Sequence, residues 1–340
     1  MDKKVEGGEP SAGPDFSGAV GSSDTYFLKI KANIEILRAA LDEYDTKKSV
    51  NTPEAEADIK DKFSQFLIGC EFYMAKMDFD ELLEESAAKP RDDGSIGWYH
   101  QMAPVLIFLS MIKDKTISLE SLEQYGGLET ALRTALRHDS IEDFGKDFDQ
   151  FEKEQKQNIL KKFTELQALG LPGFDDGRLQ KEYDNLDILM QNLRLMTKKV
   201  AILDADGNPQ YRPDGRMIRK DLFPNTRAYI HNMVNSVYAS PVVWIIKVCD
   251  GIHNLSSMIG APKFTAPRRL QYANQREDMY GSRQGLPEIA MQKWPEFAEG
   301  IKRVDHLMGS VLYTNFGYLE YVDQEKAYPN NSDKHKEGDE

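Results

Sequence analysis

The helical spacing of apolar residues most constrains what this chain can fold into. In residues 26–44 the repeat places Ile30, Ile34, Leu37 and Leu41 on one stripe of a helix. The same period returns in eight further segments, which are 57–86, 100–113, 128–138, 151–170, 178–198, 227–237, 241–259 and 286–313. Clear alternation of apolar and polar residues is almost absent, so we predict an all-α protein.

One segment departs from this pattern. In residues 200–223, VAILDADGNPQYRPDGRMIRKDLF, short β-prone runs are separated by Asp-Gly pairs, which are typical of β-hairpins. We therefore predict a hairpin excursion between helices. No repeat of fixed period occurs, which argues against a solenoid.

The two ends of the chain differ in composition from the rest. Residues 1–24 are rich in Gly, Ser, Pro and Asp, with almost no large apolar residues to offset the entropy of ordering. Residues 326–340 are similarly polar. We predict disordered tails at both ends and one domain over 25–325.

Composition favours a cytoplasmic protein. A chain of 340 residues with 40% hydrophobic content can bury a core without disulfides. Its two cysteines, Cys70 and Cys249, each lie in an apolar stretch, which indicates buried thiols in a reducing compartment. No apolar run approaches the roughly 20 residues needed to span a bilayer, and the N-terminus lacks a signal-peptide core. We expect no membrane partner.

A formal net charge of −13 weighs against non-specific binding to DNA or RNA, which depends on cationic neutralisation of phosphates. We expect no nucleic-acid polymer as a partner. A small anionic substrate remains compatible with this charge, because a metal ion and a few cations can reverse the potential inside a cleft. The composition leaves the oligomeric state open, including a homo-oligomer.

The segment ALRHDSIEDF ends a helical pattern with four ionisable residues. His138 and Asp139 are adjacent, and Glu142 and Asp143 follow one turn later. One interpretation is a charged helix end at which His138 meets the helix macrodipole. The other is a site at which several ligands and a general base share one short surface.

The strongly apolar stretch 241–258 is interrupted by Asp250, His253 and Asn254. Burying a carboxylate there is costly unless a cation or several donors compensate it, and a metal ion at Asp250 would do so. The alternative is that Asp250 faces water at the end of the buried part.

His100 lies in SIGWYHQMAPVLIFLSMI, just before a buried helical run, so we expect its imidazole to face the interior. A lone histidine on such a face is more often a hydrogen-bonded core residue than a ligand. Two imidazoles and two carboxylates together suit manganese, iron or zinc, whereas a closed structural zinc site more often uses thiolates.

Together these segments resemble the HD-domain hydrolases of bacterial alarmone metabolism, namely the RelA/SpoT hydrolase domain and the small alarmone hydrolases. The resemblance covers about 85–145 and 227–285. The motif HDSIED is complete, and RRLQYANQREDMYG (268–281) resembles the family's stretch that carries a glutamate and a tyrosine near its end. Residues that match the family in RDDGSIGWYHQ, in IKVCDGIHN and in that last stretch are Arg91, Gly94, His100, Lys247, Asp250, His253, Asn254, Glu277 and Tyr280.

The resemblance implies an HD-domain helical bundle that removes the 3′-pyrophosphate from (p)ppGpp or a related purine nucleotide. It implies Mn²⁺ as cofactor, with Zn²⁺, Fe²⁺ or Mg²⁺ as alternatives, held by His100, His138, Asp139 and Asp250. Glu142 and Asp143 would orient or deprotonate the attacking water. The implied substrate-binding residues are Arg91 at the base, Asn254 at the nucleotide, Lys247, Ser257 and Tyr280.

Three departures from the family pattern bear on the substrate. Asp92 and Gly251 stand where the family has basic residues. Residues 146–222 form a surplus between Asp139 and Asp250, which we expect to pack outside the HD core and to cover the cleft or bind a partner. Two other readings therefore stay open: an HD phosphohydrolase acting on a dNTP, a nucleoside monophosphate or a cyclic nucleotide, and a catalytically reduced regulatory protein.

Overall fold

The structure is a computed structural model. It describes residues 28, 30–35 and 37, then 53–86, 97–213, 215–236, 239–258, 265–281 and 285–327. The predicted tail 1–24 lies outside the described residues, as does the predicted tail 326–340 except for its first two residues, which end the last helix.

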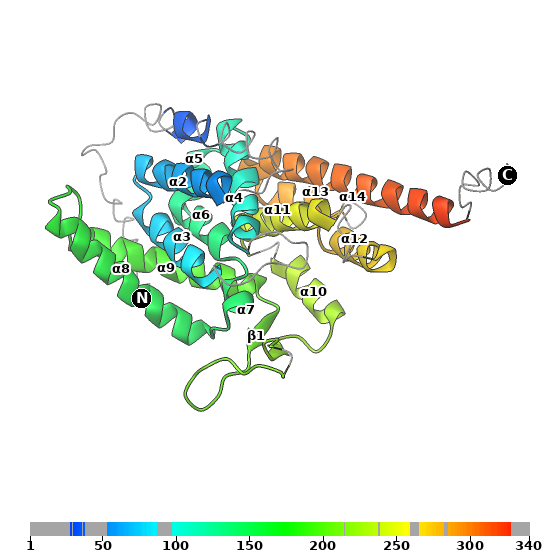
Figure 1. Cartoon of the computed structure of the whole chain (residues 1–340). Coiled ribbons are helices and arrows are strands. Elements are labelled where there is room, and N and C mark those ends of the chain that lie inside the picture. Colours follow the sequence, from blue (N-terminus) through cyan, green and yellow to red (C-terminus); the bar gives the residue numbers. More distant parts are fainter. Residues whose placement is uncertain are drawn as a thin grey trace, which may run out of the picture.

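The described part of the chain is all-α, as predicted, apart from one two-stranded sheet (Figure 1). Its helices are α2 (Pro53–Gly69), α3 (Tyr73–Ser86), α4 (Gly97–Lys113), α5 (Leu119–Glu123), α6 (Gly127–Arg137), α7 (Ser140–Phe144), α8 (Phe148–Ala168), α9 (Asp176–Met196), α10 (Thr226–Ser236), α11 (Pro241–Met258), α12 (Ala266–Tyr280), α13 (Leu286–Lys293) and α14 (Ala298–Ala327), with a 3₁₀ turn η2 (Pro295–Phe297). None of the described helices combines the length and apolar character that a membrane crossing requires.

Some helix boundaries differ from the predicted ones. The stretch 57–86 is two helices, because the chain turns at Glu71, whose φ of 63° is left-handed and cannot continue a helix. The stretch 286–313 is likewise divided, at Trp294. Helix α12 was not predicted, since its sequence is mostly polar and offers few apolar residues from which a helical period can be recognised.

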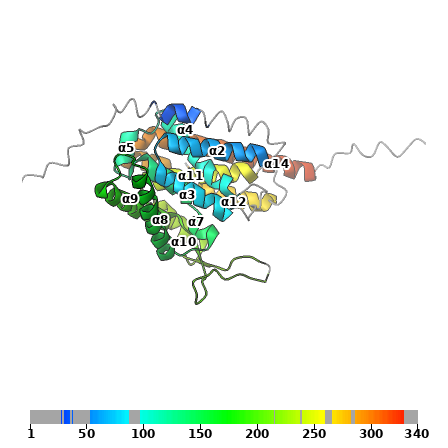
Figure 2. The ribbon, with the colours of Figure 1, turned by 60° about the vertical axis from the view of Figure 1, so that its left-hand side comes forward.

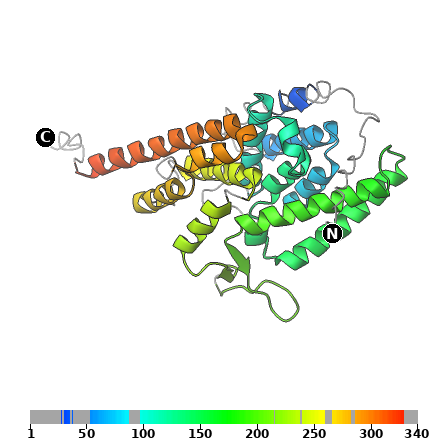
Figure 3. The ribbon, with the colours of Figure 1, turned by 180° about the vertical axis from the view of Figure 1, so that it is seen from behind.

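Helix α11 is the centre of the fold. It packs against α4, α12 and α14, and it also touches α6 and α9. Its first twelve residues are all buried, because the sequence is apolar on every face rather than along one stripe. Figure 3, the view from behind, shows the long helix α14 running beside α11.

A buried ion-pair network fixes helix α6 against α3. Arg133 and Arg137 are both fully buried on α6 and both contact Asp78 of α3, with Arg133 Nε 2.6 Å from Asp78 Oδ2. Arg137 also reaches Glu85, at 2.8 Å, and Glu81. Buried charges persist only when they are paired in this way. The network therefore anchors the end of α6, from which His138 follows.

The insert 146–222 contains two amphipathic helices and a hairpin, as predicted, but its helix α9 packs into the core rather than outside it. Helices α8 and α9 lie side by side in Figures 1 and 3, and α9 packs on α6 and α11. Leu186, Leu189 and Leu193 of α9 are fully buried in the same hydrophobic cluster as the rest of the core. The expectation was wrong for α9 because its apolar stripe needs an apolar partner, which α6 provides.

The hairpin that follows α9 extends away from the helices (Figures 1 and 2). Strands β1 (Lys199–Ala201) and β2 (Arg219–Asp221) pair antiparallel, with Lys199 opposite Asp221. Beyond them the chain turns at the predicted Asp-Gly pair, where Gly207 has a φ of 83°. The base of this hairpin contacts the helical core through β1 and α7, and Pro209 and Met217 further along it lie close to Gly145 at the end of α7.

Both cysteines are buried and unpaired with each other, as the composition predicted.

Candidate metal centre

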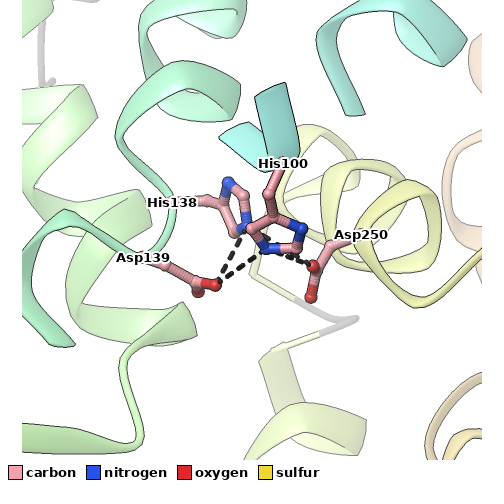
Figure 4. A group of neighbouring side chains, drawn as sticks. All are labelled: His100, His138, Asp139 and Asp250. Atoms are coloured by element: carbon pink, nitrogen blue, oxygen red, sulfur yellow. Dashed lines mark hydrogen bonds and ion pairs between the residues drawn. The ribbon is translucent and has the colours of Figure 1, made fainter. Parts of the chain in front are cut away.

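Four side chains meet where α4, α6 and α11 converge (Figure 4). They are His100 of α4, His138 and Asp139 directly after α6, and Asp250 of α11. One ligand atom from each residue lies within 4.8 Å of the other three. The structure thus brings together all four residues that the sequence suggested as metal ligands.

The end of α6 explains how two adjacent residues reach one point. Successive side chains on a continuous helix diverge and cannot face the same target. Helix α6 ends at Arg137, and Asp139 has a φ of −114° and a ψ of 6°, outside helical geometry, before α7 begins. This break allows His138 and Asp139 to converge.

The hydrogen bonding of His138 settles which ring nitrogen faces the centre. Its Nδ1 donates to the carbonyl oxygen of Ala135 at 2.8 Å, so in the neutral ring Nε2 carries the lone pair. That Nε2 is buried, makes no hydrogen bond among the described residues, and lies 3.2 Å from Asp139 Oδ2 and 3.4 Å from Asp250 Oδ1. A lone pair facing carboxylates at this range requires a positive charge between them.

His100 is oriented in the same way. Its Nε2 lies 3.4 Å from Asp139 Oδ2 and 3.4 Å from Asp250 Oδ1, while its Nδ1 lies 3.0 Å from Nδ1 of His253. The ring is fully buried, as expected from the sequence. His253 belongs to the matching motif, although no role was predicted for it, and the structure places it beside His100 as an orienting partner.

The electrostatics of the cluster favour positive charge. Burial lowers the pKa of His138, but the charges of Asp139 and Asp250 raise it to about 10. Burial raises the pKa values of Asp139 and Asp250, yet Lys247 and His138 hold both well below their usual range. The carboxylates are therefore ionised, and Lys247, together with a proton on His138 or a bound cation, compensates their charge. Asp250 is buried, so the alternative that it faces water is wrong.

Two further cations border the carboxylates. Nζ of Lys247 lies 3.3 Å from Asp139 Oδ1 and 3.3 Å from Asp250 Oδ2. Nη2 of Arg276, on α12, lies 3.7 Å from Asp250 Oδ2. Lys247 was predicted to bind substrate, whereas nothing in the sequence singled out Arg276.

Glu142 and Asp143 lie on α7 and contact the insert. Glu142 Oε1 accepts the backbone N–H groups of Lys198 and Lys199, the latter at 3.3 Å. Burial and the charge of Asp139 raise the pKa of Glu142 to about 7. Asp143 is partly exposed and lies 3.5 Å from Nη2 of Arg219, in β2. Their roles in activating water stay predictions.

The remaining residues predicted to bind substrate each have different neighbours in the structure. Asn254 Nδ2 donates to Asp250 Oδ1 at 2.6 Å, so its amide supports a candidate ligand. Ser257 lies one turn further along α11, and its hydroxyl donates to the carbonyl oxygen of Asn254 at 3.0 Å. Tyr280 is buried beside Arg276. Arg91 lies outside the described residues.

Comparisons with models of known protein families, with curated proteins and with solved structures found no match. The chemical argument for the site therefore depends on its own geometry. Two buried imidazoles, the buried carboxylate of Asp250 and the half-buried carboxylate of Asp139 face one point and form a donor set that fits a divalent cation.

Proposed function

We propose that this chain is a metal-dependent phosphohydrolase of the HD type. The observation that carries the proposal is the convergence of His100, His138, Asp139 and Asp250 on one point, with Nε2 of His138 facing a carboxylate oxygen of Asp139 at 3.2 Å and one of Asp250 at 3.4 Å. A group of this kind is costly to bury without a cation at its centre.

These four side chains would hold the ion, with manganese as the preferred candidate and zinc, iron or magnesium as alternatives. When bound, such an ion lowers the pKa of water and neutralises negative charge on phosphoryl oxygens. Asn254 and His253 keep Asp250 and His100 in orientation through the contacts described above.

Glu142 is the candidate general base. The backbone N–H groups of Lys198 and Lys199 hold its Oε1, which leaves Oε2 to accept a proton from the attacking water. A pKa of about 7 suits a residue that takes up a proton and releases it near neutral pH. Lys247 places a positive charge next to both aspartates, where a phosphoryl group would approach.

The finer part of the proposal concerns the substrate. The resemblance of the motifs around His100, His138 and Asp250 to alarmone hydrolases suggests the 3′-pyrophosphate of (p)ppGpp or of a related purine nucleotide. No polymer is implied, because the net charge of −13 opposes binding to nucleic acids.

The test is to incubate the purified protein with manganese and a panel of (p)ppGpp, (p)ppApp, dNTPs and NADPH, and to identify the products by chromatography. We expect pyrophosphate and GDP from ppGpp, and no product from an Asp139→Asn variant. The matched control is Asp184→Asn, an exposed aspartate of α9 remote from the centre, which should retain activity. Absence of hydrolysis of every compound with manganese, zinc, iron and magnesium would overturn the proposal.

A further inference from the structure

Helix α12 contributes a buried arginine to the edge of the metal centre. Arg276 lies with only 12% of its side chain exposed, and its Nη2 is 3.7 Å from Asp250 Oδ2. Its guanidinium lies 5.9 Å from the centre of the Tyr280 ring, one turn further along the same helix. The arginine therefore reaches the rim of the site from an element that carries none of the four candidate ligands.

Gly251 makes room for this arginine. A Cβ at Gly251 would already lie 3.5 Å from Cδ and 3.7 Å from Nε of Arg276, and 2.9 Å from Cε of Met308. Any side chain longer than a methyl group would have to displace the arginine. The residue directly after Asp250 thus leaves open the space that Arg276 occupies.

The hydrogen-bonding capacity of Arg276 is not used up within the described part of the chain. Its Nε is buried and has no hydrogen-bond partner there, and the 3.7 Å separation from Asp250 exceeds hydrogen-bonding distance. A buried donor without an acceptor is unfavourable. The Nη2 end of the guanidinium, 3.7 Å from Asp250 Oδ2, is the end that an acceptor bound at the centre described above would meet.

Charge balance identifies the kind of acceptor. Asp139 and Asp250 carry two negative charges, and Lys247 and Arg276 carry two positive charges, so these four side chains sum to zero. A divalent cation held by the aspartates, with both histidines neutral, gives them a surplus of two positive charges. The nearby carboxyl of Glu142 offsets at most one of these charges. The remaining surplus favours a bound anion, and a phosphoryl group is anionic and has several acceptor oxygens.

We propose that Arg276, together with Lys247, binds the phosphate or pyrophosphate group of the substrate beside the metal ion. This inference rests on the proposed function for the presence of the ion. Arginine is suited to the role because its planar guanidinium offers several donors in a fixed fork that matches phosphate oxygens, whereas lysine acts as a point charge.

The probe is inorganic pyrophosphate, whose binding to the manganese-loaded full chain is measured by calorimetry, alongside metal content and melting temperature. We expect the wild-type protein to bind pyrophosphate only with manganese present. Arg276→Gln should weaken that affinity by about tenfold or more, with metal content unchanged, because a charged donor pair is lost. Arg276→Lys keeps the charge but loses the planar guanidinium, so its affinity for pyrophosphate should lie between those of the wild type and Arg276→Gln.

The matched control is Arg268→Gln, which removes the same charge from an exposed position of the same helix and should leave the affinity unchanged. Wild-type affinity in Arg276→Gln would overturn the inference, and so would a loss of manganese together with pyrophosphate, since Arg276 would then only support Asp250. Failure of the wild-type loaded protein to bind pyrophosphate would overturn it as well. If loaded wild-type protein binds pyrophosphate but hydrolyses no nucleotide, the proposed function fails while this inference stands.

Discussion

Under the proposed function, individual residues at the centre divide into those that would hold a cation and those that would move a proton. Asp139 faces both histidines, whereas Glu142 is held by backbone donors of the insert. Replacing each carboxylate by its amide preserves shape and removes charge. The two substitutions should therefore have separable effects on metal content and on turnover.

Asp139→Asn should lose most of its manganese and its activity, because a neutral amide is a much weaker ligand. Glu142→Gln should keep its manganese and lose turnover by about a hundredfold, the usual contribution of a general base. Elemental analysis after dialysis and the initial rate of hydrolysis measure the two effects. Wild-type turnover in Glu142→Gln would remove this carboxylate from the mechanism.

Glu129 allows a residue-scale test that is independent of the metal. It is half-buried at the start of α6 and accepts the backbone N–H groups of Met74 and Ala75, at 2.7 and 3.1 Å. Burial and the charge of Glu182 raise its pKa from 4.5 to about 7, although Arg133 and the two N–H groups oppose the shift.

Between pH 4.5 and 7 the folded state therefore binds a proton that the unfolded state has released, so Glu129 makes stability fall as the pH rises. Glu129→Gln keeps an acceptor and removes this dependence. The free energy of unfolding of the variant minus that of the wild type should rise by about 2 to 3 kcal/mol when the pH is raised from 4.5 to 8. Urea unfolding of both proteins at the two pH values measures it, and an equal difference at both would contradict the prediction.

At the scale of elements, the base of the hairpin and α7 form one unit. Lys198 and Lys199 donate to Glu142, Arg219 pairs with Asp143, and Gly145 ends α7 with a φ of 76°. A Cβ on Gly145 would lie 2.6 Å from Cγ of Pro209 and 2.8 Å from Cε of Met217, both in the hairpin excursion. The insert therefore touches the candidate base directly.

Gly145→Ala should move the hairpin away from α7 and weaken its hold on Glu142. We expect turnover to fall while metal content stays unchanged, because the four ligands do not depend on this contact. Gly207→Ala is the matched control: its φ of 83° imposes a similar strain, of about 1 kcal/mol, but nothing lies within 4 Å of the added Cβ. Equal rates in the two variants would show that the contact has no role in catalysis.

For the whole molecule, the centre joins three helices that are far apart in the sequence. His100 comes from α4, His138 and Asp139 follow α6, and Asp250 lies on α11, the most buried helix. An ion bound by all of them favours only the folded state, in which these helices are assembled.

Manganese at a hundred times its dissociation constant should stabilise the fold by about 2.7 kcal/mol, since the ligands are not assembled in the unfolded chain. The melting temperature should rise by several degrees and fall again with a chelator. A His138→Ala variant should show no such response. An equal rise in that variant would place the metal elsewhere.

The sequence by itself determined the fold class and the identity of the four clustered residues. Helical period is a local property, and it located α6, α8, α9 and α11 to within a few residues. The free-energy cost of burying an unpaired carboxylate in an apolar helix likewise indicated Asp250 as a candidate ligand before its neighbours were known.

Only the tertiary structure decided how the insert and α12 take part. That α9 enters the core, that Glu142 accepts from a backbone group 56 residues away, and that Arg276 lies over Gly251 depend on packing between distant segments. No local pattern encodes such contacts, because the apolar stripe of a helix specifies that it must be covered but not by which partner. The sequence thus supplied the candidate ligands, whereas folding placed the cations and the base around them.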